Sequence, residues 1–289
     1  MSRDQSNAAM NEDQIAFWNS AHGQKWVTFQ EGLDAIHFAP LQLLLDCAAP
    51  ADGESVLDVG CGAGASTIAL ASRVGRKGRA IGLDISQPLI DHARHCAEGS
   101  EIDNVEFVLA DAQSHNFDPG SIDLVASRFG VMIFSDPVGA FNNIAGCLQP
   151  GGRVSFVSWA SLIENPWFQI PRDAAVQRLG APEVRDPYQP GPFAFSDLDY
   201  VTGLLRASGL VDCRGERCEL SLSFEGTAAD AASIASNVGA ATRIAKERGA
   251  LAEDLVAIEE TVATEFKRFG FGGSLQVPAV VNVFNARKP

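Results

Sequence analysis

The sequence predicts an α/β protein, in which a parallel sheet is covered by helices and further helices form a cap. Strand-like apolar segments alternate with helical segments between residues 55 and 159, and this alternation is typical of a parallel sheet with right-handed crossovers. The chain has 289 residues, of which 46% are hydrophobic and 20% are charged. This size and composition are ordinary for a globular protein of one or two domains with a full core.

The first 159 residues consist of a helical leader and the alternating core. Residues 1–10 are polar and predict a disordered end, and helical stretches are expected at 11–31 and 35–49. The turn residues Gln149–Gly152 should end the last helix of the core before its last strand. Within the core, the expected strands are 55–59, 78–83, 105–110, 122–127 and 153–159, and the expected helices are 65–74, 88–97 and 137–148.

The pattern changes after residue 159, where the sequence predicts an irregular segment and more helices. The expected elements are a helix at 167–179 within an irregular segment, a helix at 197–208, a strand within 211–224, helices at 227–247 and 250–269, and a closing strand at 276–286. We therefore divide the chain into an N-terminal helical lid (1–50), a cofactor-binding core (51–160), and a third part (161–289) that completes the sheet and carries cap helices at 160–195 and 227–269.

Charge and cysteine usage narrow the function classes. The net charge is −14 and the isoelectric point is about 4.7, whereas binding to nucleic acid or to an anionic membrane depends on Lys and Arg. The six cysteines form neither a CxxC pair nor a zinc spacing. The polar N-terminus and the lack of a long apolar run predict neither a signal peptide nor a membrane helix. We expect a cytoplasmic protein without a structural metal that acts on a small molecule and not on nucleic acid or a membrane, and the sequence leaves a homodimer open.

A glycine-rich turn between the first strand and the first core helix is the main functional feature. In the segment VLDVGCGAG (56–64), glycines let the backbone approach a ligand closely, and free N–H groups at the start of a helix face it. A GxG pattern alone also occurs in dinucleotide enzymes. A carboxylate two residues before the first glycine, Asp58, would oppose a pyrophosphate and would suit an ammonium or sulfonium group. The alternative is that Asp58 only hydrogen-bonds the turn.

Two further carboxylates follow the next two strands. Asp84 ends the second strand about 20 residues after the glycines, where an acidic side chain accepts hydrogen bonds from ribose hydroxyls. Asp111 ends the third strand and could accept a hydrogen bond from an adenine amino group. The alternative for Asp111 is a helix N-cap.

Together these segments resemble the class I S-adenosylmethionine-dependent methyltransferases. The matching strings are VLDVGCGAG (56–64), GLDIS (82–86), ADA (110–112) and LQPGGR (148–153). SRFG (127–130), FSDP (134–137) and NPWF (165–168) are similar to a bacterial branch near the ubiquinone and menaquinone C-methyltransferases. The resemblance implies a Rossmann-like seven-stranded sheet with an antiparallel last strand and S-adenosyl-L-methionine as cofactor. The cofactor site that it implies comprises Trp26, Asp58, Gly60, Cys61, Gly62, Gly64, Asp84, Ile85, Asp111, Ala112 and Ser127.

Methyl transfer from a sulfonium benefits from a dry site, so an apolar acceptor pocket is expected. Arg128 could hold an anionic substrate or only pair with a carboxylate. If a general base is used, His22 and His37 are the first candidates, although a structural role is favoured for any single histidine and no strong base is required. The expected pocket residues are Trp18, Arg128, Phe129, Trp159, Trp167, Tyr188 and Phe193, unless these aromatics only pack the added helices onto the sheet.

We therefore expect methyl transfer to the O, C or N atom of a small, apolar or aromatic metabolite. Two alternatives stay open at this point, which are a nicotinamide-dependent oxidoreductase and a non-catalytic cofactor-binding protein. We also expect residues 11–35 to be mobile without ligand and to close on the cofactor.

Overall fold

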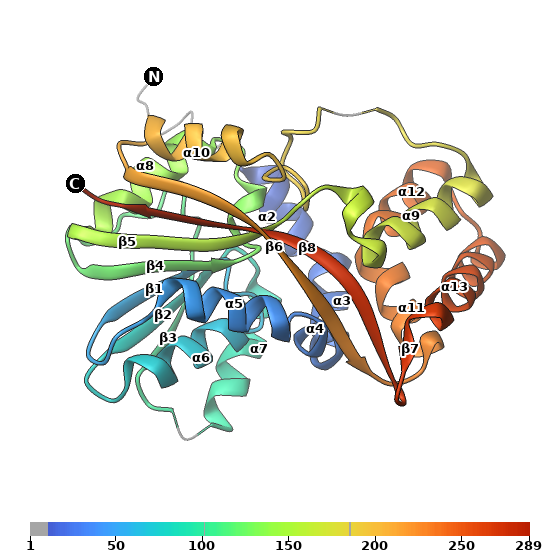
Figure 1. Ribbon diagram of the computed structural model, residues 1–289, viewed down its shortest axis with the longest axis horizontal. Coiled ribbons are helices and arrows are strands. Elements are labelled where there is room, and N and C mark those ends of the chain that lie inside the picture. The colour runs from blue at the N-terminus through green and yellow to red at the C-terminus, as the bar shows by residue number, and fades with distance from the viewer. Residues whose placement is uncertain (1–10, 101, 185) are drawn as a thin grey trace.

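The computed structural model describes residues 11–100, 102–184 and 186–289. A twisted sheet carries helices on both faces, and a group of helices forms a cap at one end (Figure 1). The disordered end that the sequence predicts at 1–10 lies outside the described residues. No helix in the described part of the chain combines the length and apolar composition that a bilayer crossing needs.

The sheet has the order β3-β2-β1-β4-β5-β8-β6, and a short β7 pairs with β8. The first five strands are parallel neighbours, whereas β8 runs antiparallel to both β5 and β6. The expected Rossmann-like sheet with a reversed last strand is thus confirmed, with β7 as an eighth, two-residue strand. The strands are β1 (Ser55–Val59), β2 (Arg79–Asp84), β3 (Val105–Leu109), β4 (Ile122–Arg128), β5 (Leu148–Trp159), β6 (Val211–Glu225), β7 (Gly270–Phe271) and β8 (Ser274–Arg287).

The beginning of β5 differs from the prediction. The preceding helix α8 (Pro137–Cys147) leads directly into β5, so Gln149–Gly152 is part of the strand and not a separate turn. The pairing jumps from Ile122↔Leu148 to Leu124↔Arg153, which is a bulge in β5. Gly151 has φ +76°, a conformation that glycine adopts without strain. The turn-forming residues therefore lie inside β5, and α8 ends at Cys147, directly before the segment that was predicted to end it.

Alternating side chains of the buried strands fill two separate cores. Val56 points to one face and packs with Leu44 and Leu70, whereas Leu57 points to the other and packs with Phe141. This two-residue alternation follows from the pleat of a strand. The helices α5 (Phe38–Ala48) and α6 (Ala65–Val74) cover the first face, α8 and α10 (Leu198–Ala207) cover the second, and α7 (Gln87–Glu98) packs against β2 and β3.

The N-terminal part is divided into more helices than the sequence predicts. The expected helix at 11–31 is replaced by α2 (Glu12–Trp18), α3 (Ala21–Thr28) and the start of α4 (Gln30–Ile36). Ser20 begins α3, where its side chain accepts a hydrogen bond from the backbone N–H of His22. An N-cap residue of this kind is non-helical, which is why one amphipathic stretch becomes separate short helices.

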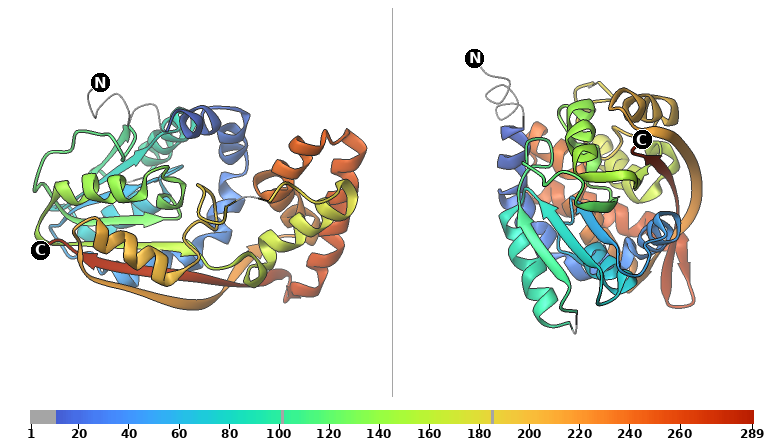
Figure 2. Two further views of the ribbon diagram at one scale, coloured as in Figure 1. Left: turned by 90° about the horizontal axis from the view of Figure 1, so that it is seen from above. Right: turned by 90° about the vertical axis from the view of Figure 1, so that its left-hand side faces the viewer.

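The cap consists of α9 (Pro166–Leu179), α11 (Ala228–Val238), α12 (Ala240–Arg248) and α13 (Ala252–Phe266). The expected helix at 227–247 is broken at Gly239, whose extended backbone separates α11 from α12. Strands β6 and β8 extend beyond the other strands as a curved two-stranded ribbon and carry α11–α13 at its far end (Figure 2).

Candidate functional site

The glycine turn after β1 packs directly against the turn after β4. Gly60 and Gly62 have φ of +69° and +55°, and the N–H groups of Gly60 and Cys61 donate to the Leu83 carbonyl at 2.8 and 3.1 Å. A Cβ on Gly60 would lie 2.5 Å from the Cα of Gly130. The two turns can therefore approach this closely only because both carry glycine at the contact.

Asp58 is fully buried and points toward the start of α6. Its Oδ2 accepts hydrogen bonds from Ser66 Oγ at 2.6 Å and Thr67 Oγ1 at 2.7 Å. Its Oδ1 is buried without a hydrogen-bond partner among the described residues, and burial raises the pKa of the carboxyl. One oxygen therefore supports the helix that follows the turn, as the structural alternative predicts, while the other is an unsatisfied acceptor.

Asp84 connects the ends of β1 and β2. Its Oδ2 accepts from the N–H of Gly62 and its Oδ1 from the N–H of Ser86, both at 2.9 Å. Desolvation outweighs these hydrogen bonds and raises the pKa of Asp84 from 3.8 to about 6. This carboxylate both supports the glycine turn and faces the cavity described next.

A cavity of about 100 Å³ lies at the carboxyl ends of β1, β2 and β4. The glycine turn and Asp84 form one wall, and aromatic and charged side chains of α3 and α4 form the opposite wall. Of the predicted residues, Trp18, Trp26, His37, Gly60, Cys61, Gly62, Asp84, Arg128 and Phe129 line this cavity, and Gln30, Leu33, Asp34, Ala63, Ser66, Leu89, Gly130 and Ile133 line it without having been predicted.

The remaining predicted cofactor residues lie behind or beside this cavity. Asp111 does not cap a regular helix, and its carboxylate accepts from the side chain of Asn11 at 2.8 Å and from the N–H of Gln113 at 3.0 Å. Ser127 donates to the Val59 carbonyl at 2.7 Å. Four others are also absent from the lining, namely the fully buried Asp58 behind the turn, Gly64 at the start of α6, Ile85 after β2 and the buried Ala112.

Contacts of the N-terminal helices cover the ends of β2 and β3. The Trp18 carbonyl accepts from Ser86 Oγ at 2.8 Å, and Asn19 donates to the Ile85 carbonyl at 2.8 Å. Pockets for drug-sized ligands usually measure about 300–1,000 Å³, so a nucleoside-sized ligand needs more room than about 100 Å³. Because α2 and α3 contribute Trp18 and Trp26 to the cavity wall, their displacement would provide that room.

Phe129 forms the aromatic floor of the cavity in an unusual backbone conformation. Its ring stacks on Trp159 with centroids 4.2 Å apart and planes 7° apart. Its φ of +65° is rare for a residue with a large side chain, and such strain is concentrated at functional sites. The Phe129 N–H donates to the Val157 carbonyl at 3.1 Å, so the sheet itself holds this conformation.

The two candidate bases differ in their surroundings. His22 is not among the cavity-lining residues, and its Nε2 accepts a hydrogen bond from the indole N–H of Trp26 at 3.1 Å. Burial lowers the pKa of His22 to about 4. His37 is buried in the cavity wall, stacked on Trp26 at 6.2 Å, and burial together with the charge of Arg128 lowers its pKa to about 3. Both imidazoles are therefore neutral at physiological pH.

Arg128 and Asp34 form an ion pair in the cavity wall. The Nη2 of Arg128 lies 3.2 Å from Asp34 Oδ1, and the side chains are 11% and 25% exposed. The Nη1 of Arg128 also donates to the His37 carbonyl at 3.4 Å. The carboxylate partner that the sequence left open for Arg128 is thus Asp34, which lies 94 positions earlier in the chain and which no local motif marks.

Four predicted pocket residues lie outside the cavity. Trp159 supports Phe129 from behind, and Trp167 stacks on Phe266 inside the cap at 5.4 Å. Phe193 packs on Phe168, and Tyr188 stacks on Tyr200 at 4.1 Å and is 44% exposed. For these residues the packing alternative describes the structure. In the described part of the chain, no group of three or more His, Cys, Asp or Glu side chains is arranged to bind a metal.

Comparisons with known proteins find similarity to methyltransferases. A family model described as a methyltransferase domain matches residues 56–152. The chain is 38% identical over 122 residues to aklanonic acid methyltransferase from Streptomyces sp. (strain C5), covering 42% of this chain and 56% of that protein. It is 33% identical over 189 residues to nocamycin O-methyltransferase from Saccharothrix syringae, covering 62% of this chain and 67% of that protein. The match to the first of these relatives thus spans little more than half of its length.

Two further similarities concern the menaquinone methyltransferases and the fold. A demethylmenaquinone methyltransferase from Lactococcus lactis subsp. lactis is 35% identical over 102 residues, covering 35% of this chain and 42% of that protein. The crystal structure of a putative methyltransferase from Bacillus halodurans has a TM-score of 0.54 at 20% identity, covering 87% of this chain and 99% of that one. At this identity the structural likeness concerns the fold alone.

Proposed function

The chain belongs to the class I S-adenosylmethionine-dependent methyltransferases, and from this premise we propose that it transfers a methyl group to an oxygen atom of a small, apolar or aromatic metabolite. The observation that carries the proposal is the cavity in which the glycine turn and Asp84 face an aromatic wall. The relatives support the oxygen acceptor, because one is an O-methyltransferase and another acts on aklanonic acid.

The residues around the turn have the chemistry that an adenosyl amino acid requires. Asp58 would attract the positive groups of the methionine part, since its Oδ1 is an unsatisfied buried acceptor and such a group gains most from a charged partner. Asp84 would accept hydrogen bonds from the ribose hydroxyls. Asp111 would accept from the adenine amino group, which is a donor of the same kind as the Asn11 amide that it now binds. The bound cofactor supplies a methyl group on a positively charged sulfur.

The acceptor end of the cavity would orient and shield the substrate. Phe129 offers a flat apolar face backed by Trp159, and the rings of Trp26 and His37 complete the wall. Apolar side chains exclude water, which strengthens electrostatic interactions in the site. Orientation at contact distance is the main requirement for a direct displacement, so a neutral His37 is compatible with the proposed activity.

Calorimetric titration tests the proposed cofactor against the nicotinamide alternative. The protein should bind S-adenosylhomocysteine in the micromolar range or tighter and should not bind NAD⁺, because the carboxylate of Asp58 disfavours a pyrophosphate near the turn. Tighter binding of NAD⁺, or no binding of S-adenosylhomocysteine, would reject the assignment. Transfer of labelled methyl from S-adenosylmethionine to a metabolite extract then separates an enzyme from a non-catalytic binder.

The affinity for S-adenosylhomocysteine should decrease at acidic pH. The pKa of Asp84 is raised to about 6 in the free protein, and the ionised carboxylate is the better acceptor for two ribose hydroxyls. Ligand binding therefore lowers the pKa of Asp84. By linkage, the affinity is constant at pH values above the pKa of the free protein and falls by about tenfold per pH unit below that pKa. Titrations across this range check the prediction, with Asp84→Asn as the variant that should lose most of the pH dependence. A wild-type affinity that does not change between neutral pH and pH about 5 would contradict it.

The N-terminal helices should become more protected when the ligand binds. Their contacts to the sheet are side-chain hydrogen bonds such as Asn11–Asp111 and Asn19–Ile85, which must rearrange if the cavity is to enlarge. We expect residues 11–28 to exchange amide hydrogens several-fold more slowly with S-adenosylhomocysteine than without it, while α5 changes little. Hydrogen-exchange mass spectrometry provides this comparison, and equal protection of residues 11–28 in both states would argue against the movement.

A further inference from the structure

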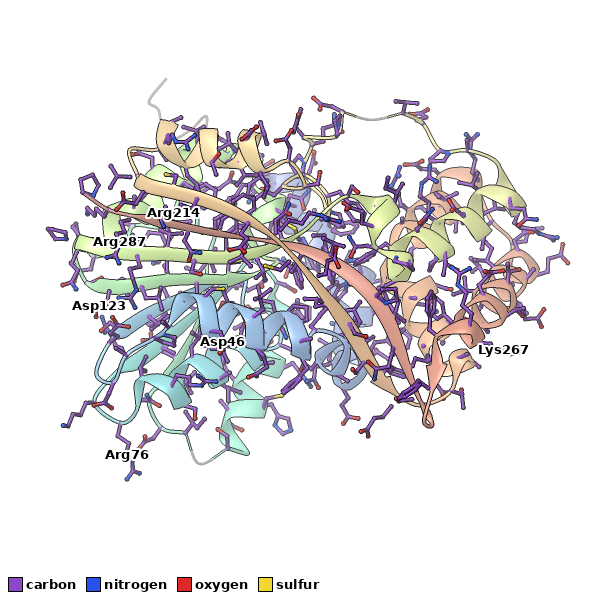
Figure 3. The ribbon with its side chains drawn as sticks, viewed as in Figure 1. Asp46, Arg76, Asp123, Arg214, Lys267 and Arg287 are labelled. Carbon is purple, nitrogen blue, oxygen red and sulfur yellow. The ribbon has the colours of Figure 1, made fainter. Side chains whose placement is uncertain are left out.

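Arg128 differs from the other arginines around the sheet because its guanidinium is held inside the site. Arg76, Arg214 and Arg287 lie at the outside of the molecule (Figure 3). The side chain of Arg128 is only 11% exposed and lines the cavity between Phe129 and the N-terminal helices. A guanidinium carries five N–H donors, and within the described residues only two contacts engage it, which are those to Asp34 and to the His37 carbonyl. The remaining donors are available to a ligand.

Among the described residues, the wall formed by α3 and α4 offers no group that could readily remove a proton from an acceptor, and Asp84 on the opposite wall is assigned to the ribose hydroxyls. His37 is held neutral with a pKa of about 3, far below the range in which a general base is effective. The Nε2 of His22 is engaged by the Trp26 indole. Asp34 accepts hydrogen bonds from Arg128 on one oxygen and from Gln30 on the other. An acceptor whose oxygen still carries a proton would therefore lack a partner to take it.

Charge considerations also separate the classes of acceptor. A neutral amine becomes a cation when it gains a methyl group, and a cation beside Arg128 in a dry site is unfavourable. An oxyanion is attracted to the same guanidinium, and charged hydrogen bonds of this kind are the strong ones. Before transfer, the positive charges of the sulfonium and Arg128 balance the negative charges of Asp34 and the acceptor. Of these four groups, only Arg128 and Asp34 are still charged after transfer.

We propose that the acceptor enters as an oxyanion, a carboxylate or an enolate on a flat apolar ring, and that Arg128 binds it while Phe129 supports the ring. This inference rests on the proposed methyl transfer and specifies its substrate class. The acceptor oxygen uses a lone pair to form the new O–C bond, the C–S bond breaks, and its electron pair stays on sulfur. No proton is released, so the reaction needs no base.

Matched probes test this assignment. The protein is saturated with S-adenosylhomocysteine and titrated by calorimetry with 2-naphthoate and with 2-naphthamide, which have the same ring and differ in charge. A charged hydrogen bond contributes about 1.5–3 kcal/mol, so the carboxylate should bind about tenfold more tightly or better. In Arg128→Gln this preference should fall below about twofold.

The control variant is Arg153→Gln, which removes another partly buried arginine ion pair, to Glu54. Glu54 directly precedes β1, so this pair lies away from the carboxyl ends of the strands that form the cavity. This variant should keep the full preference for 2-naphthoate. Equal affinity for the two probes, failure of 2-naphthoate to bind, or a preference that survives in Arg128→Gln would overturn the proposal. The comparison within the wild-type protein does not depend on the folding of any variant. Failure to bind S-adenosylhomocysteine would instead contradict the proposed function, so the two failures are distinguishable.

Discussion

Substitution of Gly130 by alanine is expected to reduce the affinity for S-adenosylhomocysteine by about 100-fold. A Cβ at this position would lie 2.3 Å from the Val59 carbonyl oxygen and 2.6 Å from the Cα of Gly60, and both are backbone atoms that can move only if the glycine turn moves. A misplacement of about 1 Å can cost about 100-fold in reaction rate, and we expect a loss of similar size in affinity when the binding groups of the turn are displaced. The added methyl group should also lower the free energy of unfolding by about 1–3 kcal/mol, as overpacking does.

Calorimetry and urea denaturation measure the two effects separately. Gly146→Ala in α8 is the matched control, because a Cβ there meets no atom within 4 Å and the position is helical and exposed. The control should keep its affinity and gain up to about 1 kcal/mol from the better helix propensity of alanine. If Gly130→Ala binds S-adenosylhomocysteine as the wild type does, the contact between the two turns does not position the ligand.

Substitution of Asp58 by asparagine is expected to weaken S-adenosylhomocysteine binding by about 10- to 100-fold without unfolding the protein. The amide oxygen can still accept from Ser66 and Thr67, so the start of α6 keeps its support. The amide nitrogen then replaces the unsatisfied Oδ1 and presents a donor to the ligand ammonium group, with loss of a charged interaction of about 1.5–3 kcal/mol.

Whereas Asp58→Asn should bind the ligand more weakly, its stability should be equal to or higher than that of the wild type. Burial raises the pKa of Asp58, so the ionised carboxyl costs stability in the free protein at neutral pH, and that cost grows as pH rises through the unfolded-state pKa. Asp58→Asn should therefore unfold at the same or a higher temperature than the wild type. Asp123→Asn is the control, since Asp123 accepts from the Ser55 N–H at the far end of the sheet and should not affect the ligand. If Asp58→Asn binds S-adenosylhomocysteine as tightly as the wild type does, the charge of Asp58 does not contribute to ligand binding.

The sheet could be predicted from sequence because its strands are short apolar segments bounded by turn residues. The boundaries of β1 and α6 agree with the prediction. The breaks in the helical parts could not be predicted, since Ser20 and Gly239 fit within long periodic stretches. Their effect depends on what the flanking helices pack against, which is tertiary information.

The candidate site was predictable only where it lies within local motifs. Gly60 and Gly62 follow β1 and Asp84 ends β2, and the carboxyl ends of parallel strands meet at one edge. The ion pair of Asp34 with Arg128 joins two distant elements and leaves no pattern in either. Aromatic residues were the least reliable indicators, because Trp167 packs the cap core for the same physical reason that could have placed it in a pocket.

The curved ribbon of β6 and β8 has a consequence for how ligands reach the site. Its pairing continues without a break from Arg214↔Asn285 to Glu225↔Ser274, so α11–α13 are attached through a stiff arm instead of a flexible joint. Bending the β6–β8 ribbon would strain many backbone hydrogen bonds at once, whereas α2 and α3 are held to the sheet by a few side-chain hydrogen bonds. We therefore expect both reactants to enter beside α2 and α3, while α11–α13 keep their position relative to the sheet.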